Sequence, residues 1–484
     1  RVVRKLAFIN KKTKEKTTFG VIVGNRDVFP SHLAKEGREE IIKALDDLGY
    51  NYVILDEEAT GFGVVETYED AKVCAQLFKK HRNEIEGIIV CLPNFGDEKG
   101  IANTIRLARL EVPVLIQASA DKVEEMDRKH RRDAFCGKIS VTSVLKQYNI
   151  PFTLTSLHTC DINSDVFKED IDRFEKICKI VNKLKNARLG QIGTRPNAFE
   201  TVKKKKKIME RSGISVEPID LSEIFARIRI LDDNDEKVKE KIEFIKDYTD
   251  APEYSDEGVL KLAKLGVVVE EWIIENELDG FAFQCWPSIQ DNYGIVPCAV
   301  MSIFSEGLVP AACEVDVAGL LGMLILQLAS DSPSAILDWN NNYGDDPNKM
   351  VLFHCSNLPK SFFQDTKMTV HPIISDQKGD DVTFGAIQGR IKNEPCTLLR
   401  METDDLTGNM KALLSEGEYT DDILNTYGGY GVVEIPQLQE LLKKLCKGGF
   451  AHHVAATLNE VGEIVHEALN NYLGWDIEYH NPEN

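Results

Sequence analysis

Short segments of strand length alternate with amphipathic segments through the first two thirds of the chain. Residues 19–23 form a β-branched run, and apolar side chains then recur at helical spacing as far as Leu48, with Ser31 placed to cap that helix. Further segments of strand length follow at residues 52–55, 87–92, 114–117 and 151–154. Alternating strands and helices predict a parallel sheet that is covered by helices on both faces.

The alternation begins again near Arg188 and gives way to consecutive strands near residue 345. A long helix is predicted over residues 260–276, between strands at 189–192, 216–220 and 280–284. Beyond residue 345 the strand-like segments lie at 349–353, 368–374, 382–389 and 396–402. We expect a helix over 454–473 to close the chain.

The predicted fold class is α/β, with two Rossmann-like α/β domains that contain parallel sheets, followed by a mostly β C-terminal domain. We place the three domains at residues 1–165, 166–345 and 346–484. Glu314 and Asp338 then belong to the second domain, and His453 belongs to the third.

Composition excludes several classes of function. The formal charge is −20, from 58 Lys and Arg against 78 Asp and Glu, which argues against non-specific nucleic-acid binding and against docking on anionic membranes. We find no uninterrupted apolar run of about 18 residues and no apolar signal-peptide core, so neither a transmembrane helix nor secretion is expected. The 11 cysteines are scattered and odd in number, which predicts reduced thiols in a cytoplasmic protein.

Four candidate metal ligands lie in the last third of the chain: Glu314, Asp338, His354 and His453. Each stands at the edge of an apolar strand-like or tight-turn segment. Two carboxylates and two imidazoles suit Mn²⁺ or Co²⁺ better than a structural zinc ion, which favours thiolates. Taken singly, such an acid is more often a helix cap or a surface residue, and such a histidine is more often a hydrogen-bonded core residue.

The segments around these residues resemble the L-fucose isomerase family, a distant relative of the L-arabinose isomerases. The most specific stretches are PAACEVDVAGLLGMLILQLAS, AILDWNN and VLFHCSNLP, at residues 310–330, 335–341 and 351–359. Residues 188–202, 394–418 and 448–474 also resemble parts of that family. The similarity covers most of the chain, whereas the N-terminal third supports only a general α/β fold.

The resemblance implies an aldose–ketose isomerase, an intramolecular oxidoreductase that works through a cis-enediol. Glu314 and Asp338 match the two metal-binding carboxylates of the family, which also act as its acid/base pair. His453 matches the C-terminal metal ligand, and His354 matches a histidine ligand on the arabinose-isomerase side. The implied ion is Mn²⁺, with Co²⁺ or Mg²⁺ as alternatives, and it would chelate O1 and O2 of a sugar such as L-fucose or D-arabinose. A homo-oligomer, trimer or hexamer, with active sites at its interfaces is also implied.

Four further residues are candidates for binding the substrate. Arg26 follows the first strand at the edge where open α/β sheets bind ligands, although an ordinary loop explains it as well. Gln284 and Trp286 follow the strand at 280–284 and offer an amide and an aromatic face, yet a core tryptophan is equally consistent. His452 is adjacent to the proposed ligand His453, where it could orient that ligand or bind a sugar oxygen.

Two alternatives stay open at this point. The same chemistry could act on a sulfonated or phosphorylated hexose such as sulfoquinovose, which would need Arg or Lys at the far end of the pocket, with Arg26 or Arg195 as candidates. The chain could also be a non-catalytic sugar-binding protein, although such a protein needs no four-ligand metal site.

Overall fold

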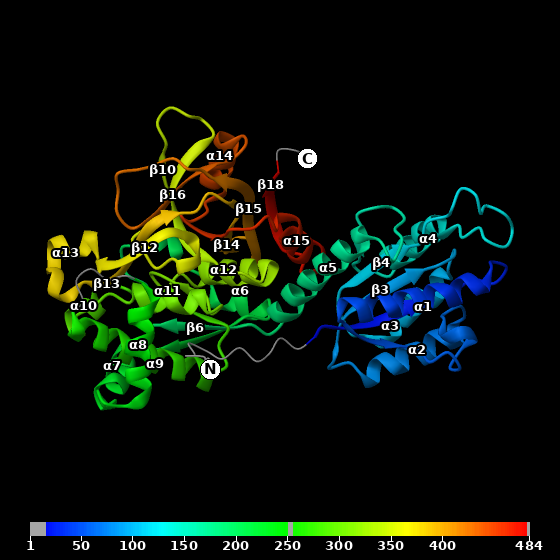
Figure 1. Cartoon of the computed structure of the whole chain (residues 1–484), viewed down its shortest axis with the longest axis horizontal. Coiled ribbons are helices and arrows are strands. Elements are labelled where there is room, and N and C mark those ends of the chain that lie inside the picture. The colour runs from blue at the N-terminus through cyan, green and yellow to red at the C-terminus, as the bar shows by residue number, and fades with distance from the viewer. Residues whose placement is uncertain (1–15, 250–254, 482–484) are drawn as a thin grey trace. The chain divides into compact units, whose positions relative to one another are not determined.

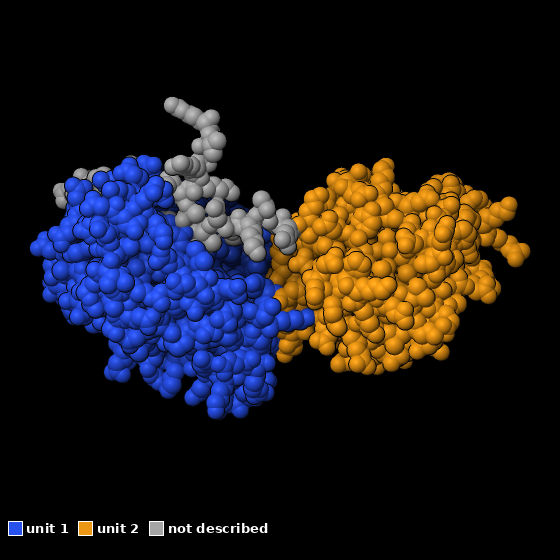
Figure 2. Space-filling view, turned by 90° about the horizontal axis from the view of Figure 1, so that it is seen from below, with its two compact units in different colours: residues 1–11, 183–466, 475–484 blue, residues 12–182, 467–474 orange. Residues whose placement is uncertain are grey.

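The computed structural model describes residues 16–249 and 255–481, which form two compact units (Figure 1; Figure 2). Unit 2 comprises residues 12–182 together with 467–474, and unit 1 comprises residues 1–11, 183–466 and 475–484. The predicted fold class is confirmed, because two parallel α/β sheets precede a large, mostly antiparallel sheet. The expected boundaries at residues 165 and 345 stay predictions.

Unit 2 is a doubly wound α/β fold. Its five parallel strands lie in the order β2-β1-β3-β4-β5, with bounds β1 Thr18–Val23, β2 Asn51–Ile54, β3 Ile85–Leu92, β4 Val114–Ala118 and β5 Thr153–Leu154. The helices that connect or cover them are α1 Ser31–Leu48, α2 Tyr68–Lys80, α3 Glu98–Ala108, α4 Ala134–Gln147 and α5 Asp165–Leu184.

Side chains of β1 alternate between two apolar cores, as the pleat of a strand requires. Ile22 packs in the core that contains residues of α2, α3 and α4, whereas Phe19, Val21 and Val23 pack with α1 and α5. Helices therefore cover both faces of this sheet, as the sequence predicts.

Unit 1 begins with a four-stranded parallel sheet in the order β7-β6-β8-β9. Its strands are β6 Arg188–Ile192, β7 Ser215–Ile219, β8 Gly280–Phe283 and β9 Ala311–Ala312. The helices of this part are α6 Lys206–Arg211, α7 Leu221–Ile230, α8 Glu236–Tyr248, α9 Asp256–Glu275, α10 Ser288–Asn292, α11 Cys298–Glu306 and α12 Val317–Ser330.

The rest of unit 1 is built on a nine-stranded sheet in the order β12-β13-β16-β11-β10-β17-β14-β15-β18. Its strands are β10 Ala335–Asn342, β11 Lys349–His354, β12 Phe363–Val370, β13 Phe384–Ile391, β14 Pro395–Asp404, β15 Asn409–Tyr419, β16 Gly429–Glu434, β17 His453–Thr457 and β18 Asp476–His480. Three short helices accompany it: α13 Pro372–Lys378, α14 Leu438–Gly448 and α15 Gly462–His466. Asp338 lies on a strand of this sheet.

Helix α12 lies between the two sheets of unit 1. It is apolar around nearly its whole circumference and buried along most of its length, as expected for a helix enclosed on all sides. Two of its glycines allow this close fit, since a side chain at Gly319 would meet Ile336 on β10 and one at Gly322 would meet Ala455 on β17. The start of α12 is thereby held against the strands that carry Asp338 and His453.

Three local predictions are wrong. Ser31 does not cap α1, because Pro30 occupies the cap position and the Ser31 hydroxyl accepts a hydrogen bond from Asn25. Residues 454–473 are not one helix, because 453–457 form β17 in the middle of the large sheet. Residues 372–374 are not strand, because Pro372 starts α13 at a position that favours proline.

The cysteines and the apolar helices bear on two further expectations from the sequence. All 11 cysteines lie in the described residues and are free. Among the described residues, no helix combines the length and the apolar character that crossing a bilayer requires.

Candidate active site

Glu314 lies in a strained turn between β9 and α12. Glu314 and Val315 have φ angles of 50° and 59°, in the left-handed region that residues with a Cβ rarely adopt. The turn is held by hydrogen bonds from the Val315 amide to the Phe283 carbonyl and from the Asp316 amide to the Cys313 carbonyl. Strained backbone of this kind is typical of functional sites, where it aims a side chain in a fixed direction.

The register of the large sheet brings the other candidate ligands together. Asp338 on β10 lies opposite Phe353 on β11 and opposite His453 on β17. His354 is the next residue after Phe353 and ends β11. Because β10 is the strand between β11 and β17, its carboxylate lies close to His453 on β17, while His354 ends the strand on the other side.

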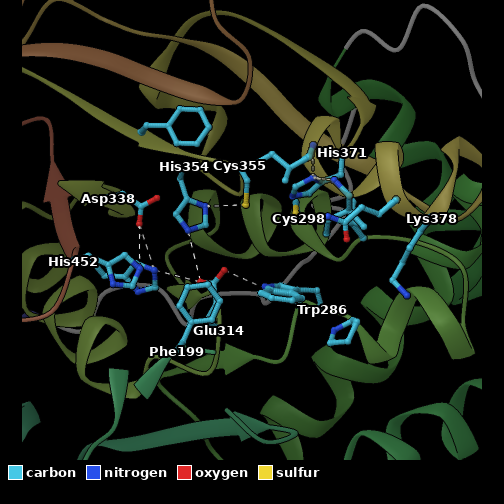
Figure 3. A pocket seen from close by; sticks show the side chains of 18 residues that line it. Phe199, Trp286, Cys298, Glu314, Asp338, His354, Cys355, His371, Lys378 and His452 are labelled. Carbon is cyan, nitrogen blue, oxygen red and sulfur yellow. Dashed lines mark hydrogen bonds and ion pairs between the residues drawn. The ribbon is translucent and has the colours of Figure 1, made fainter. Parts of the chain in front are cut away.

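The four predicted metal ligands and His452 form a cluster of two overlapping groups that share His453: Glu314 with His354 and His453, and Asp338 with His452 and His453. Glu314 Oε2 lies 3.3 Å from His453 Nε2 and 3.8 Å from His354 Nε2. Asp338 Oδ1 lies 3.5 Å from His453 Nε2 and 3.7 Å from His452 Nε2. Figure 3 shows Glu314, Asp338, His354 and His452 converging at one end of a cavity.

The cluster fits a divalent cation. Neither Glu314 Oε2 nor Asp338 Oδ1 has a hydrogen-bond partner within the described part of the chain, although both atoms are buried. Two ligand atoms that each lie about 2.1 Å from one ion are about 3.0 to 3.5 Å apart at ordinary coordination angles. The distances from His453 Nε2 to Glu314 Oε2 and to Asp338 Oδ1 are close to this range. Buried carboxylate oxygens without partners are costly unless a cation or a hydrogen-bond donor faces them.

The electrostatics of the cluster also favour positive charge. Burial works against the ionised form of Glu314, but His354 and His453 hold its pKa far below the usual value. Burial likewise works against a charged imidazole at His453, yet the neighbouring carboxylates of Asp316 and Glu314 raise its pKa to about 10. The carboxylates thus stabilise a cation at this position, and a divalent metal ion would supply one.

A buried chain of charged residues supports His453 from behind, and the sequence analysis missed it. Asp316 Oδ2 accepts a hydrogen bond of 2.9 Å from His453 Nδ1, and the same carboxylate pairs with the guanidinium of Arg400. Arg400 Nη2 lies 2.8 Å from Glu402 Oε1, which also accepts a 3.0 Å hydrogen bond from the Ala451 amide. One feature of the sequence indicates this chain of charges: Arg400 is a charged residue inside an apolar strand, where charged side chains are rare unless they are paired.

The cavity has a volume of about 320 Å³ and combines the cluster with aromatic and apolar walls. Trp286 and His452, both predicted to bind substrate, lie on its wall. Phe199, which sequence reasoning missed, stacks on His452 with ring centroids 5.7 Å apart and meets Trp286 edge-on at 5.6 Å. The other lining residues are Cys285, Pro287, Val296, Cys298, Phe353, Cys355, His371, Ile373, Ile374, Gln377 and Lys378.

Two predicted substrate-binding residues are not among those that line the cavity within unit 1. Gln284 is not among the residues that line the cavity, and its Oε1 accepts a hydrogen bond of 3.0 Å from the Thr194 amide. Arg26 belongs to unit 2, where it pairs with Glu98 and its guanidinium lies 4.3 Å from the ring centroid of Phe95. The assignment of both residues to substrate stays a prediction.

Comparison with known proteins matches both ends of the chain to one group of enzymes. Residues 20–185 match the family model of the fucose/sulfoquinovose isomerase N-terminal domain, and residues 352–481 match that of the L-fucose isomerase C-terminal domain. A sulfoquinovose isomerase of Priestia megaterium is 23% identical over 338 residues, which are 69% of this chain and 73% of that protein. One of Alkalicoccus urumqiensis is 22% identical over 364 residues, 74% of this chain and 79% of that protein.

A solved 3-phosphoglycerate dehydrogenase of Entamoeba histolytica covers 65% of this chain at 13% identity with a TM-score of 0.14, too low to support any argument. The α/β fold, the large β-sheet and the two family models define a sugar isomerase of the aldose–ketose class. The chain belongs to the fucose/sulfoquinovose isomerase family, which confirms the resemblance seen in its sequence.

Proposed function

We propose that this chain is a metal-dependent isomerase of an uncharged aldose such as L-fucose or D-arabinose. The observation that carries the proposal is the pair of buried oxygens, Glu314 Oε2 and Asp338 Oδ1, that lack hydrogen-bond partners in the described chain and share the neighbour His453 Nε2. Glu314, Asp338, His354 and His453 would hold the ion. Mn²⁺ is the preferred candidate, with Co²⁺ and Mg²⁺ as alternatives, because the set mixes oxygen and imidazole donors.

The two carboxylates are suited to moving a proton between neighbouring carbons. In the open-chain aldose, one carboxylate takes the C2 proton while O1 gains a proton, which gives a cis-enediol. A carboxylic acid then delivers a proton to C1 while O2 loses its own, which gives the ketose. When bound, the divalent cation supplies stabilisation of the negative charge that develops on the substrate oxygens.

Other residues of the cavity have supporting roles in this proposal. His453 is fixed through Nδ1 by Asp316, so its Nε2 faces the two carboxylates. Trp286 and Phe199 provide aromatic faces for the C–H groups of a sugar and keep water from that wall. His452, 3.7 Å from Asp338, is placed to bind a sugar hydroxyl.

An uncharged substrate is favoured by the charges around the cavity. Lys378 is the only Lys or Arg among the lining residues of the described chain, and its ammonium group is paired with Asp291. An anionic group at C6 would therefore have to displace Asp291. The second candidate is the same chemistry on a 6-sulfonated hexose, and the names of the curated relatives favour it.

The assembly and compartment are proposals as well. The family resemblance supports a homo-oligomer. The 11 free cysteines support a reducing compartment such as the cytoplasm.

The test is an activity assay on a panel of sugars, with chelator-stripped protein compared with the same protein after Mn²⁺ is restored. The panel contains L-fucose, D-arabinose, L-arabinose and a 6-sulfonated hexose. We expect ketose from a neutral aldose only when metal is present. Turnover of the sulfonated hexose alone would replace the first candidate with the second, and no turnover of any sugar by the metal-loaded protein would overturn the proposal.

A further inference from the structure

Two cysteine thiols lie next to Glu314, and one of them, Cys285, contacts the carboxylate oxygen that does not face the histidines. Cys313 follows β9 directly and precedes Glu314 in the chain, and Cys285 lies just beyond the end of β8. The two strands are parallel neighbours, with Ala282 opposite Ala312. Both thiols are therefore placed at the same edge of the four-stranded sheet, next to the strained turn that carries Glu314.

The three side chains are close enough to share one ion. The Cys285 thiol donates a hydrogen bond of 3.7 Å to Glu314 Oε1, and ligand atoms of Cys285, Cys313 and Glu314 all lie within 4.8 Å of one another. A sulfur about 2.3 Å and an oxygen about 2.1 Å from one tetrahedral zinc-like ion lie about 3.6 Å apart, so the measured separation fits a shared cation.

The surroundings distinguish this group from cysteines that merely fill a core. Cys285, Cys313 and Glu314 are 5%, 0% and 5% exposed, so a carboxylate is buried beside two thiols rather than in water. Cys285 lines the cavity, so an ion that enters the cavity can reach the thiol. Cys298 and Cys355 line the same cavity, whereas Cys396 is buried on β14 and is not part of that lining.

We propose that Cys285, Cys313 and Glu314 Oε1 form a second cation site that takes thiophilic divalent ions such as Cd²⁺ or Zn²⁺. This site shares Glu314 with the site formed by its other oxygen, Oε2. On binding, each thiol releases its proton to water and forms a sulfur–metal bond, so the ion replaces two protons. Mn²⁺ and Mg²⁺ prefer oxygen donors to thiolates and leave this site empty.

Occupation of this site has a consequence that rests on the proposed function. A Glu314 carboxylate held by cations on both oxygens has no free lone pair in position to accept the C2 proton of a sugar. Thiophilic ions should therefore inhibit the isomerase even when Mn²⁺ is saturating. Their effect should follow the occupancy of the thiol site and not the loss of Mn²⁺.

The binding test needs no turnover. Full-length protein is reduced, freed of reductant under anaerobic conditions and saturated with Mn²⁺, and Cd²⁺ is then added while the ultraviolet thiolate-to-cadmium absorption band is followed. We expect the band to saturate at one Cd²⁺ per chain, with bound Mn²⁺ retained in the electron paramagnetic resonance signal. Cys285→Ser and Cys313→Ser should each lower the Cd²⁺ affinity at least about tenfold.

Cys396→Ser is the matched control, because it places the same hydroxyl at a buried cysteine outside the cavity and should leave the band unchanged. Circular dichroism of each variant verifies folding. A missing band in wild-type protein that still binds Mn²⁺ overturns the second site alone. A band that survives in both Cys285→Ser and Cys313→Ser also overturns it. A normal band in protein that does not bind Mn²⁺ supports the second site and contradicts the proposed function instead.

Discussion

At the scale of single residues, Asp316 links the fold to the site. Its Oδ1 accepts a hydrogen bond of 2.8 Å from the Gly319 amide and so caps α12, while its Oδ2 holds His453. Burial would raise the pKa of Asp316, but Arg400 and His453 hold it well below the usual value. One ionised side chain therefore sets both the start of the helix and the orientation of the imidazole.

Asp316→Asn should weaken Mn²⁺ binding about 10- to 100-fold, because the amide no longer fixes His453 and leaves Arg400 with one carboxylate fewer. The measurement is Mn²⁺ affinity by competition with a chelator. Glu270→Gln is a matched control, because it removes the charge of a carboxylate that lies 2.7 Å from buried Lys241 in the same unit. Equal Mn²⁺ affinities in Asp316→Asn and wild type would show that Asp316 has only a structural role.

At the scale of elements, α13 forms part of the cavity wall and depends on His371 for its start. His371 Nδ1 accepts hydrogen bonds of 3.3 Å from the amides of Ile373 and Ile374, a role that requires an unprotonated nitrogen. Burial, together with the charge of His354, lowers the pKa of His371 to about 4. The helix is therefore capped by a neutral imidazole.

Acid should weaken this cap. In the folded protein the pKa of His371 is about 4, below its ordinary value of 6.5. As the pH falls, the unfolded chain therefore binds a proton at His371 before the folded protein does. The free energy of unfolding decreases as the pH falls below 6.5 toward 4. Between pH 7 and pH 5 this residue should account for about 2 kcal/mol of the free energy of unfolding. His371→Asn keeps a capping oxygen without a titrating group, so denaturant unfolding of the variant should show a correspondingly smaller loss. The same loss in both proteins would contradict this assignment.

The sequence predicts where helices and strands lie more accurately than it predicts which strands pair and which side chains meet across the sheets. The α/β alternation and the strands at 19–23 and 87–92 are confirmed, because apolar periodicity reports which face of an element is buried. The helix expected over 454–473 includes residues 454–457 of β17, because a short, continuous apolar run fits a buried strand and a buried helix equally well. The pairing of Asp316 with Arg400 joins residues 84 positions apart, and no local pattern encodes it.

At the scale of the whole molecule, the chain contributes to unit 2 twice. After α15 the segment Glu467–Gly474 completes unit 2, where the Tyr472 hydroxyl lies 2.8 Å from Thr153 Oγ1 and 3.2 Å from the Val114 carbonyl. Glu467 Oε1 accepts a further hydrogen bond of 2.8 Å from Thr153. The expected single helix over 454–473 therefore divides into the strand β17 and the short helix α15 of unit 1 and a helical segment of unit 2.

The central claim is that Glu314 is one of two carboxylates that remove the C2 proton of a sugar and deliver a proton to C1 with the help of a divalent cation. Its most direct test is isomerisation in deuterium oxide by the Mn²⁺-loaded wild-type protein and by Glu314→Gln. We predict ketose that carries solvent deuterium at C1, and a fall in turnover of about 10³-fold in the variant with its fold intact. Ketose that keeps the original hydrogen in full, together with unchanged turnover by Glu314→Gln, would contradict the claim.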